Sequence, residues 1–418
     1  MSTKSNLMDN RLSGADGFRA MACLAVIFHH LSQFLAMQSQ SPWMQELQSF
    51  LLMGNAGVSV FFVLSGYLLA SPYWQKYLDG SAYPDIKQYV VRRAARIMPG
   101  YYIAVIVATL ITVLFHVPTE HFWARLMAEL TFTAGFHYIT LFPNEVNGPL
   151  WSISFEVFCY VLMPLFMFGL YRWMFKQRTI RNGLLYWVVV FVLILGLNQL
   201  VHLFFSTGSE GKGWDYGWIG GAKYWMPNYN PVGFFGQFTI GILAAGVSAG
   251  LRQSSHGINR IRAMGVFDFV SLGGLLGSFA LLWFVRHMPE FSLSLQKQPF
   301  FFPFYSLLIA ISLCAASQSR WAANLLDNRV FKFTSKVSFG LYLWHFVIIG
   351  VSSVTWAKDF QYMGTQSLST WLSVSGVVLV VSFLFATLSF YFVEKPVLHW
   401  SHGKRKFMGN TPQPLLEA

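Results

Sequence analysis

The sequence has few charged residues, which make up 11% of its 418 amino acids. Soluble domains carry about a quarter, because their surfaces face water. The composition therefore excludes an ordinary water-soluble globular protein. Apolar residues make up 55% and gather in runs of about 20, the length that crosses a ~30 Å hydrocarbon core. Because backbone in lipid must satisfy its own hydrogen bonds, these runs predict an all-α polytopic membrane bundle.

Cysteine is also scarce, which argues against a disulfide framework, and no metal site is expected. All three cysteines fall inside apolar runs: Cys23, Cys159 and Cys314. No cleavable signal peptide is visible, because the first apolar stretch contains Arg19 and two histidines. No internal repeat is visible either, which weakens the interpretation as a transporter built from duplicated halves.

The apolar runs predict about ten membrane-spanning helices. Their expected bounds are 17–37, 55–75, 97–117, 148–171, 184–205, 232–251, 266–286, 300–316, 336–356 and 368–396. Segment 122–140 is amphipathic and is expected to lie in the interface or to re-enter the membrane. We expect residues 1–400 to form one integral-membrane domain and residues 401–418 a short basic cytoplasmic tail.

The net charge of +12 is distributed for membrane orientation and argues against a nucleic-acid partner. If the N-terminus is cytoplasmic, most basic residues fall in the inner loops. The exceptions are Arg125, Lys212, Lys223, Arg286, Lys297 and Lys358. This alternation predicts an even number of spans with both termini in the cytoplasm.

The first predicted span carries an arginine and a histidine on one face. Arg19 and His30 are eleven residues apart, so they lie within about 20° of each other around a helix and about 16 Å apart along it. His29 lies roughly 80° away from that face. The simpler alternative is an inner-rim anchor with histidines that hydrogen-bond between helices. Polar groups at membrane depth are costly, however, and favour a functional interpretation.

Six motifs in order resemble the acyltransferase-3 family of integral-membrane acyltransferases. They are DGFRAMA at 16–22 followed by His30, GVSVFFVLSG at 57–66, RRAARIMPGY at 92–101, WSISFE at 151–156, SFGLYLWH at 338–345 and EKP at 394–396. The chain departs from the family pattern at Ser59, where many members carry Asp, and at His29, which is usually aromatic. We expect no fused extracytoplasmic domain of the kind that some members carry, so a second catalyst, if needed, would be a separate partner enzyme.

The resemblance implies transfer of an acyl group, usually acetyl, from cytoplasmic acyl-CoA to a hydroxyl. Acceptors would be surface glycans, lipid-linked sugars or small natural products, and the location would be a bacterial inner membrane. His30 is the expected general base, since an imidazole is the usual side chain for that task near neutral pH. A transporter of acylated glycolipid or organic solute is the alternative. Oligomeric state stays open.

Coenzyme A carries several phosphates, and Arg92, Arg93 and Arg96 form a candidate cation cluster for them. If a helix begins near Pro99, its free N–H groups would add to this site. Arginines before a span are also what membrane topology alone requires.

The expected catalytic residues are His30, Arg19 and Glu156. Glu156 is expected to have Arg19, Arg96 or an imidazole as its partner. It would orient His30, hold the acceptor or form a structural pair, and these options stay open. Asp16 is expected to cap the first helix and pair with Arg19. The further candidates are His29, Ser65, Tyr101, Ser152 and His345.

Three expectations favour structural roles. We expect His345 to hydrogen-bond between helices. Glu394 is expected to be structural, with Pro396 ending its helix. The aromatic group Trp214, Trp218, Tyr224 and Trp225 is interpreted as an interfacial belt rather than a sugar platform.

Overall fold

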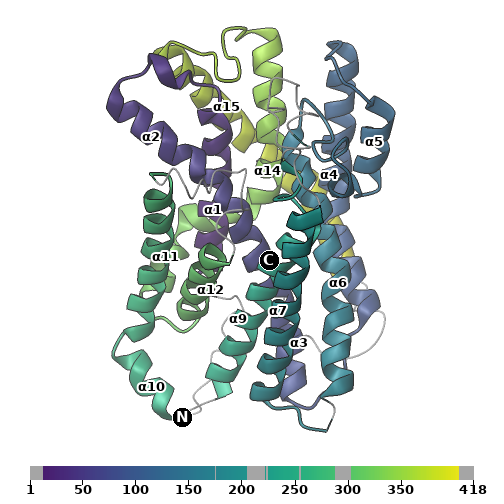
Figure 1. The fold of residues 1–418 in the computed structure, drawn as a ribbon, viewed down its shortest axis with the longest axis vertical. Coiled ribbons are helices and arrows are strands. Elements are labelled where there is room, and N and C mark those ends of the chain that lie inside the picture. The colour runs from purple at the N-terminus through teal and green to yellow at the C-terminus, as the bar shows by residue number, and fades with distance from the viewer. Residues whose placement is uncertain are drawn as a thin grey trace.

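The computed structural model describes residues 13–403, except 175, 205–221, 223–224, 254–255 and 288–302. Every regular element within this part of the chain is helical (Figure 1). Eight helical segments are long and apolar enough to cross a membrane. They comprise α2 with α3 (Pro42–Leu52, Gly57–Leu78), α4 (Ile86–Leu114), α6 (Trp151–Trp173), α7 (Ile180–Phe204), α9 (Pro231–Gln253), α11 (Val266–Val285), α14 (Arg329–Thr355) and α15 with α16 (Leu368–Ser389, Lys395–Gly403).

Two further helices, α1 (Ala15–Ser32) and α12 (Phe304–Ala316), coincide with the first and eighth predicted spans. Each predicted span therefore coincides with a helix, and the all-α polytopic prediction is confirmed. The amphipathic segment forms only the short helix α5 (Phe122–Leu130) and a following turn, so it does not span.

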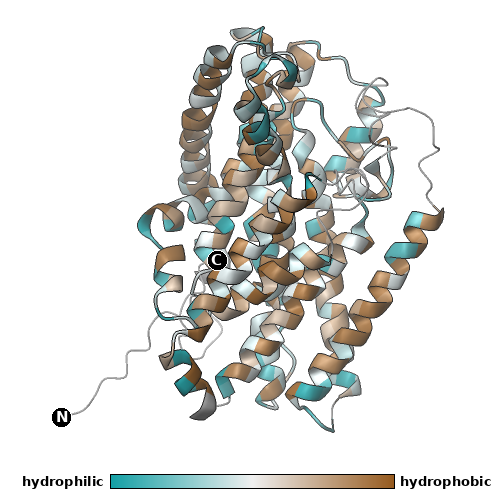
Figure 2. Ribbon diagram, turned by 60° about the vertical axis from the view of Figure 1, so that its left-hand side comes forward, coloured by the Kyte–Doolittle hydropathy of each residue, from teal (hydrophilic) through white to brown (hydrophobic). Residues whose placement is uncertain are grey.

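The bundle is built around polar α1 and glycine-rich α9. α1 packs between α14 and α3, while α9 is buried along most of its length against α3, α7 and α12. Peripheral helices present apolar side chains outward, as α7 does with Leu193 and Leu203. Hydrophobic residues run along the helices between more polar ends (Figure 2). This distribution is that of a bundle solvated by lipid.

Glycine sets the closest helix crossings. A Cβ on Gly66 of α3 would lie 2.1 Å from the Phe238 carbonyl oxygen of α9. Reciprocally, a Cβ on Gly241 would lie 2.0 Å from the Val63 carbonyl oxygen. A Cβ on Gly57 would likewise lie 2.4 Å from the Ala22 carbonyl oxygen of α1. Small residues at crossings allow backbones to meet in a membrane, and here they allow α3 to pack closely against both α9 and α1.

The start of α1 differs from the expectation for Asp16. Gly14 is the N-cap, in the left-handed conformation, and its N–H donates to Asp327 Oδ2 at 2.7 Å. Asp16 instead accepts a hydrogen bond from Ser335 Oγ at 2.6 Å. The capping prediction was wrong because a carboxylate distant in sequence, Asp327, already satisfies the free donors of the helix end.

Two proline predictions were also wrong. α4 begins at Ile86, capped by Asp85, so Pro99 lies inside the helix. The three arginines are therefore helical, and no free N–H groups of a helix start lie beside them. At the other end of the chain, a π-helical turn (Phe390–Glu394) leads into α16, and the helix continues through Pro396. Proline is tolerated there because it occupies the first turn of α16.

Candidate active site

His30 lies in the last turn of α1, partly buried, where three imidazoles gather. Its ring centroid is 4.9 Å from that of His29 and 5.3 Å from that of His345 on α14. His30 Nδ1 is 3.1 Å from Gln33 Oε1. Because an amide oxygen only accepts, Nδ1 carries the hydrogen and the lone pair is on Nε2. A neutral imidazole in this tautomer is ready to accept a proton.

The other two histidines are held by backbone carbonyls. His29 Nδ1 bonds the Leu52 carbonyl oxygen at 2.7 Å, and His345 Nδ1 bonds that of Leu341 at 2.9 Å. The expected interhelical hydrogen bond of His345 was therefore wrong, since Leu341 belongs to the same helix. His345 is fully buried, and its Nε2 has no hydrogen-bond partner within the described residues.

A cavity of about 70 Å³ opens beside His30. Its wall is largely aromatic, with a few amide and imidazole groups. The lining residues are Val26, His29, His30, Gln33, Asn55, Val58, Phe142, Gly148, Pro149, Trp151, Trp225, Tyr229, Tyr342 and Tyr362. Ligand sites commonly have this composition, in which apolar walls surround a few placed polar groups.

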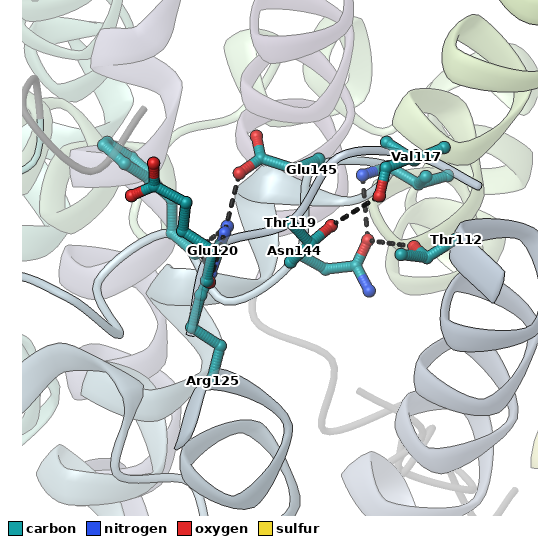
Figure 3. A network of polar contacts seen from close by, with 9 residues as sticks. Thr112, Val117, Thr119, Glu120, Arg125, Asn144 and Glu145 are labelled. Atoms are coloured by element: carbon teal, nitrogen blue, oxygen red, sulfur yellow. Dashed lines mark hydrogen bonds and ion pairs between the residues drawn. The ribbon is translucent and has the colours of Figure 1, made fainter. Parts of the chain in front are cut away.

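One wall of this cavity is the loop that precedes α6. The buried Arg125 holds this loop in place through the polar contacts drawn in Figure 3. Arg125 of α5 pairs with Glu145 at 2.7 Å and donates twice to the Phe142 carbonyl oxygen. Asn144 accepts from Thr112 of α4 at 3.3 Å. α5 therefore positions Phe142 against the cavity, a role that the sequence analysis missed.

The same helix carries a second buried carboxyl group. Glu129 is fully buried, and neither of its side-chain oxygens has a hydrogen-bond partner in the described part of the chain. Burial raises its pKa to about 8, against the opposing effect of Arg125. Tyr101, a candidate site residue, donates to the Glu129 carbonyl oxygen at 2.8 Å. Tyr101 therefore anchors α5 on α4 and is not among the residues that line the His30 cavity.

At the other end of α1, Arg19 faces protein and has two arginines of α4, Arg93 and Arg96, among its charged neighbours. Asp16 and Tyr160 of α6 also lie within electrostatic range. Both Arg19 and His30 thus face into the bundle, as the helical spacing predicted. Arg92, on the same helix as the other two arginines, is partly buried.

Glu394 is the buried counter-charge of this arginine group. It is 3.8 Å from Arg96 and fully buried, while Arg96 is 15% exposed. Glu394 Oε1 also accepts from Ser389 Oγ at 3.3 Å. The pair joins the π-helical turn to α4 and agrees with the structural role expected of Glu394.

Glu156 has hydroxyl partners rather than the expected arginine or imidazole. Its Oε1 accepts from Ser65 Oγ at 3.1 Å and from the Tyr160 hydroxyl in a short hydrogen bond. Because Tyr160 is also a neighbour of Arg19, these bonds connect Glu156 with the inner arginines.

Ser152, another candidate, contacts a residue that lines the His30 cavity. Its Oγ is 2.6 Å from the Tyr342 hydroxyl, and Tyr342 lines the His30 cavity. The described residues contain no cluster of three His, Cys, Asp or Glu side chains suited to a metal ion.

Comparisons with known proteins support the family resemblance. A family model for an acyltransferase domain matches residues 12–387. The chain is 22% identical to the peptidoglycan O-acetyltransferase OatA of Listeria monocytogenes, over 91% of this chain and 55% of that protein. It is 26% identical to the putative peptidoglycan O-acetyltransferase YrhL of Bacillus subtilis, over 92% and 55%.

A putative O-acetyltransferase of Staphylococcus aureus is 23% identical, over 92% of this chain and 57% of that protein. The chain thus spans a little over half the length of these relatives. No solved structure matches it. Since the family model covers nearly the whole chain, from the first helix to α15, the protein belongs to the acyltransferase-3 family of membrane acyltransferases.

Proposed function

We propose that this protein transfers an acetyl group from cytoplasmic acyl-CoA to a hydroxyl group of a glycan on the outer side of a bacterial inner membrane. The observation that carries the proposal is the His30 imidazole, whose Nδ1 bonds Gln33 while the ring borders a cavity. The names of the relatives support acetyl as the group and a glycan as the acceptor. A lipid-linked sugar is an equivalent acceptor in this chemistry.

The charge distribution supports entry of the donor from the inner side. Arg19, Arg93 and Arg96 form a cationic group that suits the phosphates of coenzyme A. Because α1 is continuous from Ala15 to Ser32, His30 lies about 16 Å further along the helix. An extended pantetheine arm has a comparable length, so the thioester would reach the imidazoles.

The transfer step follows from the protonation state of His30. The acceptor hydroxyl gives its proton to Nε2 as its oxygen attacks the thioester carbonyl carbon. The tetrahedral intermediate collapses, the C–S bond breaks, and the coenzyme leaves as a thiol with the proton held by His30. General-base assistance of this kind contributes about 10²–10⁴-fold to a rate.

The test is transfer of radiolabelled acetyl from acetyl-CoA by the purified protein in detergent. We expect His30→Ala to lose about 10²–10⁴-fold in rate with normal expression. His399→Ala, an exposed histidine on α16, is the matched control and should be fully active. Full activity of His30→Ala would refute the base assignment, and a wild type that neither transfers nor hydrolyses acetyl-CoA would favour a transporter.

A further inference from the structure

The cavity beside His30 contains an aromatic corner made by three side chains. The Trp151 and Tyr229 ring centroids are 4.7 Å apart with planes at 72°, and those of Trp225 and Tyr229 are 5.6 Å apart at 77°. All three are at most 7% exposed. Trp151 begins α6, whereas Trp225 and Tyr229 precede α9, so tertiary packing alone creates the corner.

This placement contradicts the interfacial-belt interpretation of Trp225. A belt residue lies at the lipid surface, but Trp225 is 7% exposed and lines an internal cavity. Trp214, Trp218 and Tyr224 of the same predicted belt lie outside the described residues. Trp173, at the end of α6, is by contrast 72% exposed and faces the lipid.

Polar groups of the cavity complement the aromatic corner. Asn55 and Gln33 contribute side-chain amides, and His30 adds the imidazole. Since Gln33 Oε1 accepts from His30, the Gln33 –NH₂ group still has hydrogens to donate. A pyranose ring has C–H faces that pack on aromatic rings and hydroxyl edges that hydrogen-bond to amides. The cavity offers both kinds of surface within one space.

The size of the cavity limits how much of an acceptor it takes. About 70 Å³ is several times the ~10–15 Å³ that one water needs, which leaves room for the reacting edge of one sugar. The remainder of a glycan chain would extend out of the mouth. A small cavity beside the base also restricts which hydroxyl reaches His30.

The geometry points to a sugar-binding subsite, in which the reacting edge of one pyranose ring of the acceptor packs on Trp151, Trp225 and Tyr229. Asn55 and Gln33 bind its hydroxyls, and one hydroxyl is presented to His30 Nε2. This inference rests on the proposed acyl transfer to a glycan, and it names the residues that hold one sugar of that acceptor beside the base.

The test measures two reactions of labelled acetyl-CoA with purified protein. One is transfer to an N-acetylglucosamine tetrasaccharide, and the other is hydrolysis by water without added acceptor. Trp225→Ala should raise the KM for the tetrasaccharide and lower the ratio of transfer to hydrolysis roughly tenfold, as loss of one aromatic contact implies. Trp173→Ala, the matched lipid-facing control, should leave both reactions unchanged.

Two gentler variants keep the test decisive if Trp225→Ala does not fold. Trp225→Phe retains a ring and should recover most of the transfer, whereas Asn55→Ala should raise KM with little change in folding. Unchanged KM in both Trp225→Ala and Asn55→Ala would overturn the subsite. So would a wild type that acetylates 1-hexanol as readily as the tetrasaccharide. A wild type that neither transfers nor hydrolyses the donor would instead refute the proposed function itself.

Discussion

The two ends of α1 solve the problem of polar groups in a membrane in opposite ways. The inner end gathers charge, with Arg19 beside Arg93 and Arg96 and the buried carboxylate of Glu394 bonded to the last of these. The outer end gathers neutral groups, in which His30 adjoins His345, amides and aromatic rings. One helix therefore connects a charged group with an uncharged cavity.

The difference teaches where each kind of chemistry is tolerated. A formal charge costs least near the membrane boundary and most at depth. Arginines suit the phosphates of a donor that enters from water, whereas an imidazole can be neutral at rest and carry a charge only while it holds a proton. We infer that the inner end determines donor affinity and the outer end determines the chemistry and the acceptor. The predictions below test this division.

The largest effect is expected at the cavity wall before α6, where Arg125→Met would leave the partly buried Glu145 without its partner. Breaking such a pair costs about 3–5 kcal/mol, and the Phe142 carbonyl would also lose two hydrogen bonds. Thermal unfolding in detergent should show a clear fall in Tm, and the KM for a glycan acceptor should rise more than that for acetyl-CoA. Equal changes in the two KM values would contradict the assignment of this wall to the acceptor.

The next largest effect is expected at the inner end. Arg19→Gln removes one cation and should weaken acetyl-CoA binding by about 10- to 100-fold, as loss of charge-assisted hydrogen bonds implies. Equilibrium binding of labelled acetyl-CoA checks this, and raised salt should weaken the wild type more than the variant. Arg172→Gln, an exposed arginine of α6, is the control. Normal acetyl-CoA affinity in Arg19→Gln would contradict the inference that the inner end of α1 determines donor affinity.

A smaller effect is expected at Glu156, which accepts a hydrogen bond from Tyr160, a neighbour of Arg19, and lies within electrostatic range of Tyr342 in the His30 cavity. Ser65→Ala removes one hydrogen bond to this carboxylate but leaves the Tyr160 bond in place. The loss should be about 1 kcal/mol, or roughly fivefold in the rate of transfer. Glu156→Gln should be more damaging, since it removes the charge. A Ser65→Ala variant slower than Glu156→Gln would show that Ser65 acts independently of the carboxylate.

The fold was largely predictable because the membrane imposes strict local rules. Long apolar runs must be helices, and each predicted span coincides with one. Helix ends were less predictable, because their partners are distant in sequence. Asp327 accepts a hydrogen bond from Gly14, more than three hundred residues away in the sequence, so no local pattern predicts that contact.

The candidate site was likewise predictable in part. The shared inward direction of Arg19 and His30 follows from helical periodicity, and Gln33, one turn after His30, was open to the same reasoning. The aromatic corner and the approach of His345 were not, because they depend on how α6 and α14 pack around α1. Glu156 was identified but given the wrong partners, since a charge suggests an ion pair and the fold supplies hydroxyls.

The smallest effect on activity is expected for Glu129→Gln, which changes stability in a pH-dependent way. Burial raises the pKa of this carboxyl from 4.5 to about 8, and Arg125 and Tyr101 are its titratable neighbours. The folded state therefore binds a proton more tightly than the unfolded state, and this stabilisation is full below pH 4.5 and is lost as pH rises toward 8. Gln is a neutral isostere without this loss.

The Tm of Glu129→Gln should therefore match the wild type near pH 4.5, exceed it by a growing margin up to about pH 8, and stay a constant several degrees above it at higher pH. Transfer activity should change little, because Glu129 does not line the His30 cavity. Glu120→Gln, at an exposed position on the loop before α5, is the control for removal of one carboxyl group. If the Tm difference between Glu129→Gln and the wild type shrank with rising pH, Glu129 would be ionised and paired with Arg125. The cavity wall held by α5 would then be charged, as the inner end of α1 is.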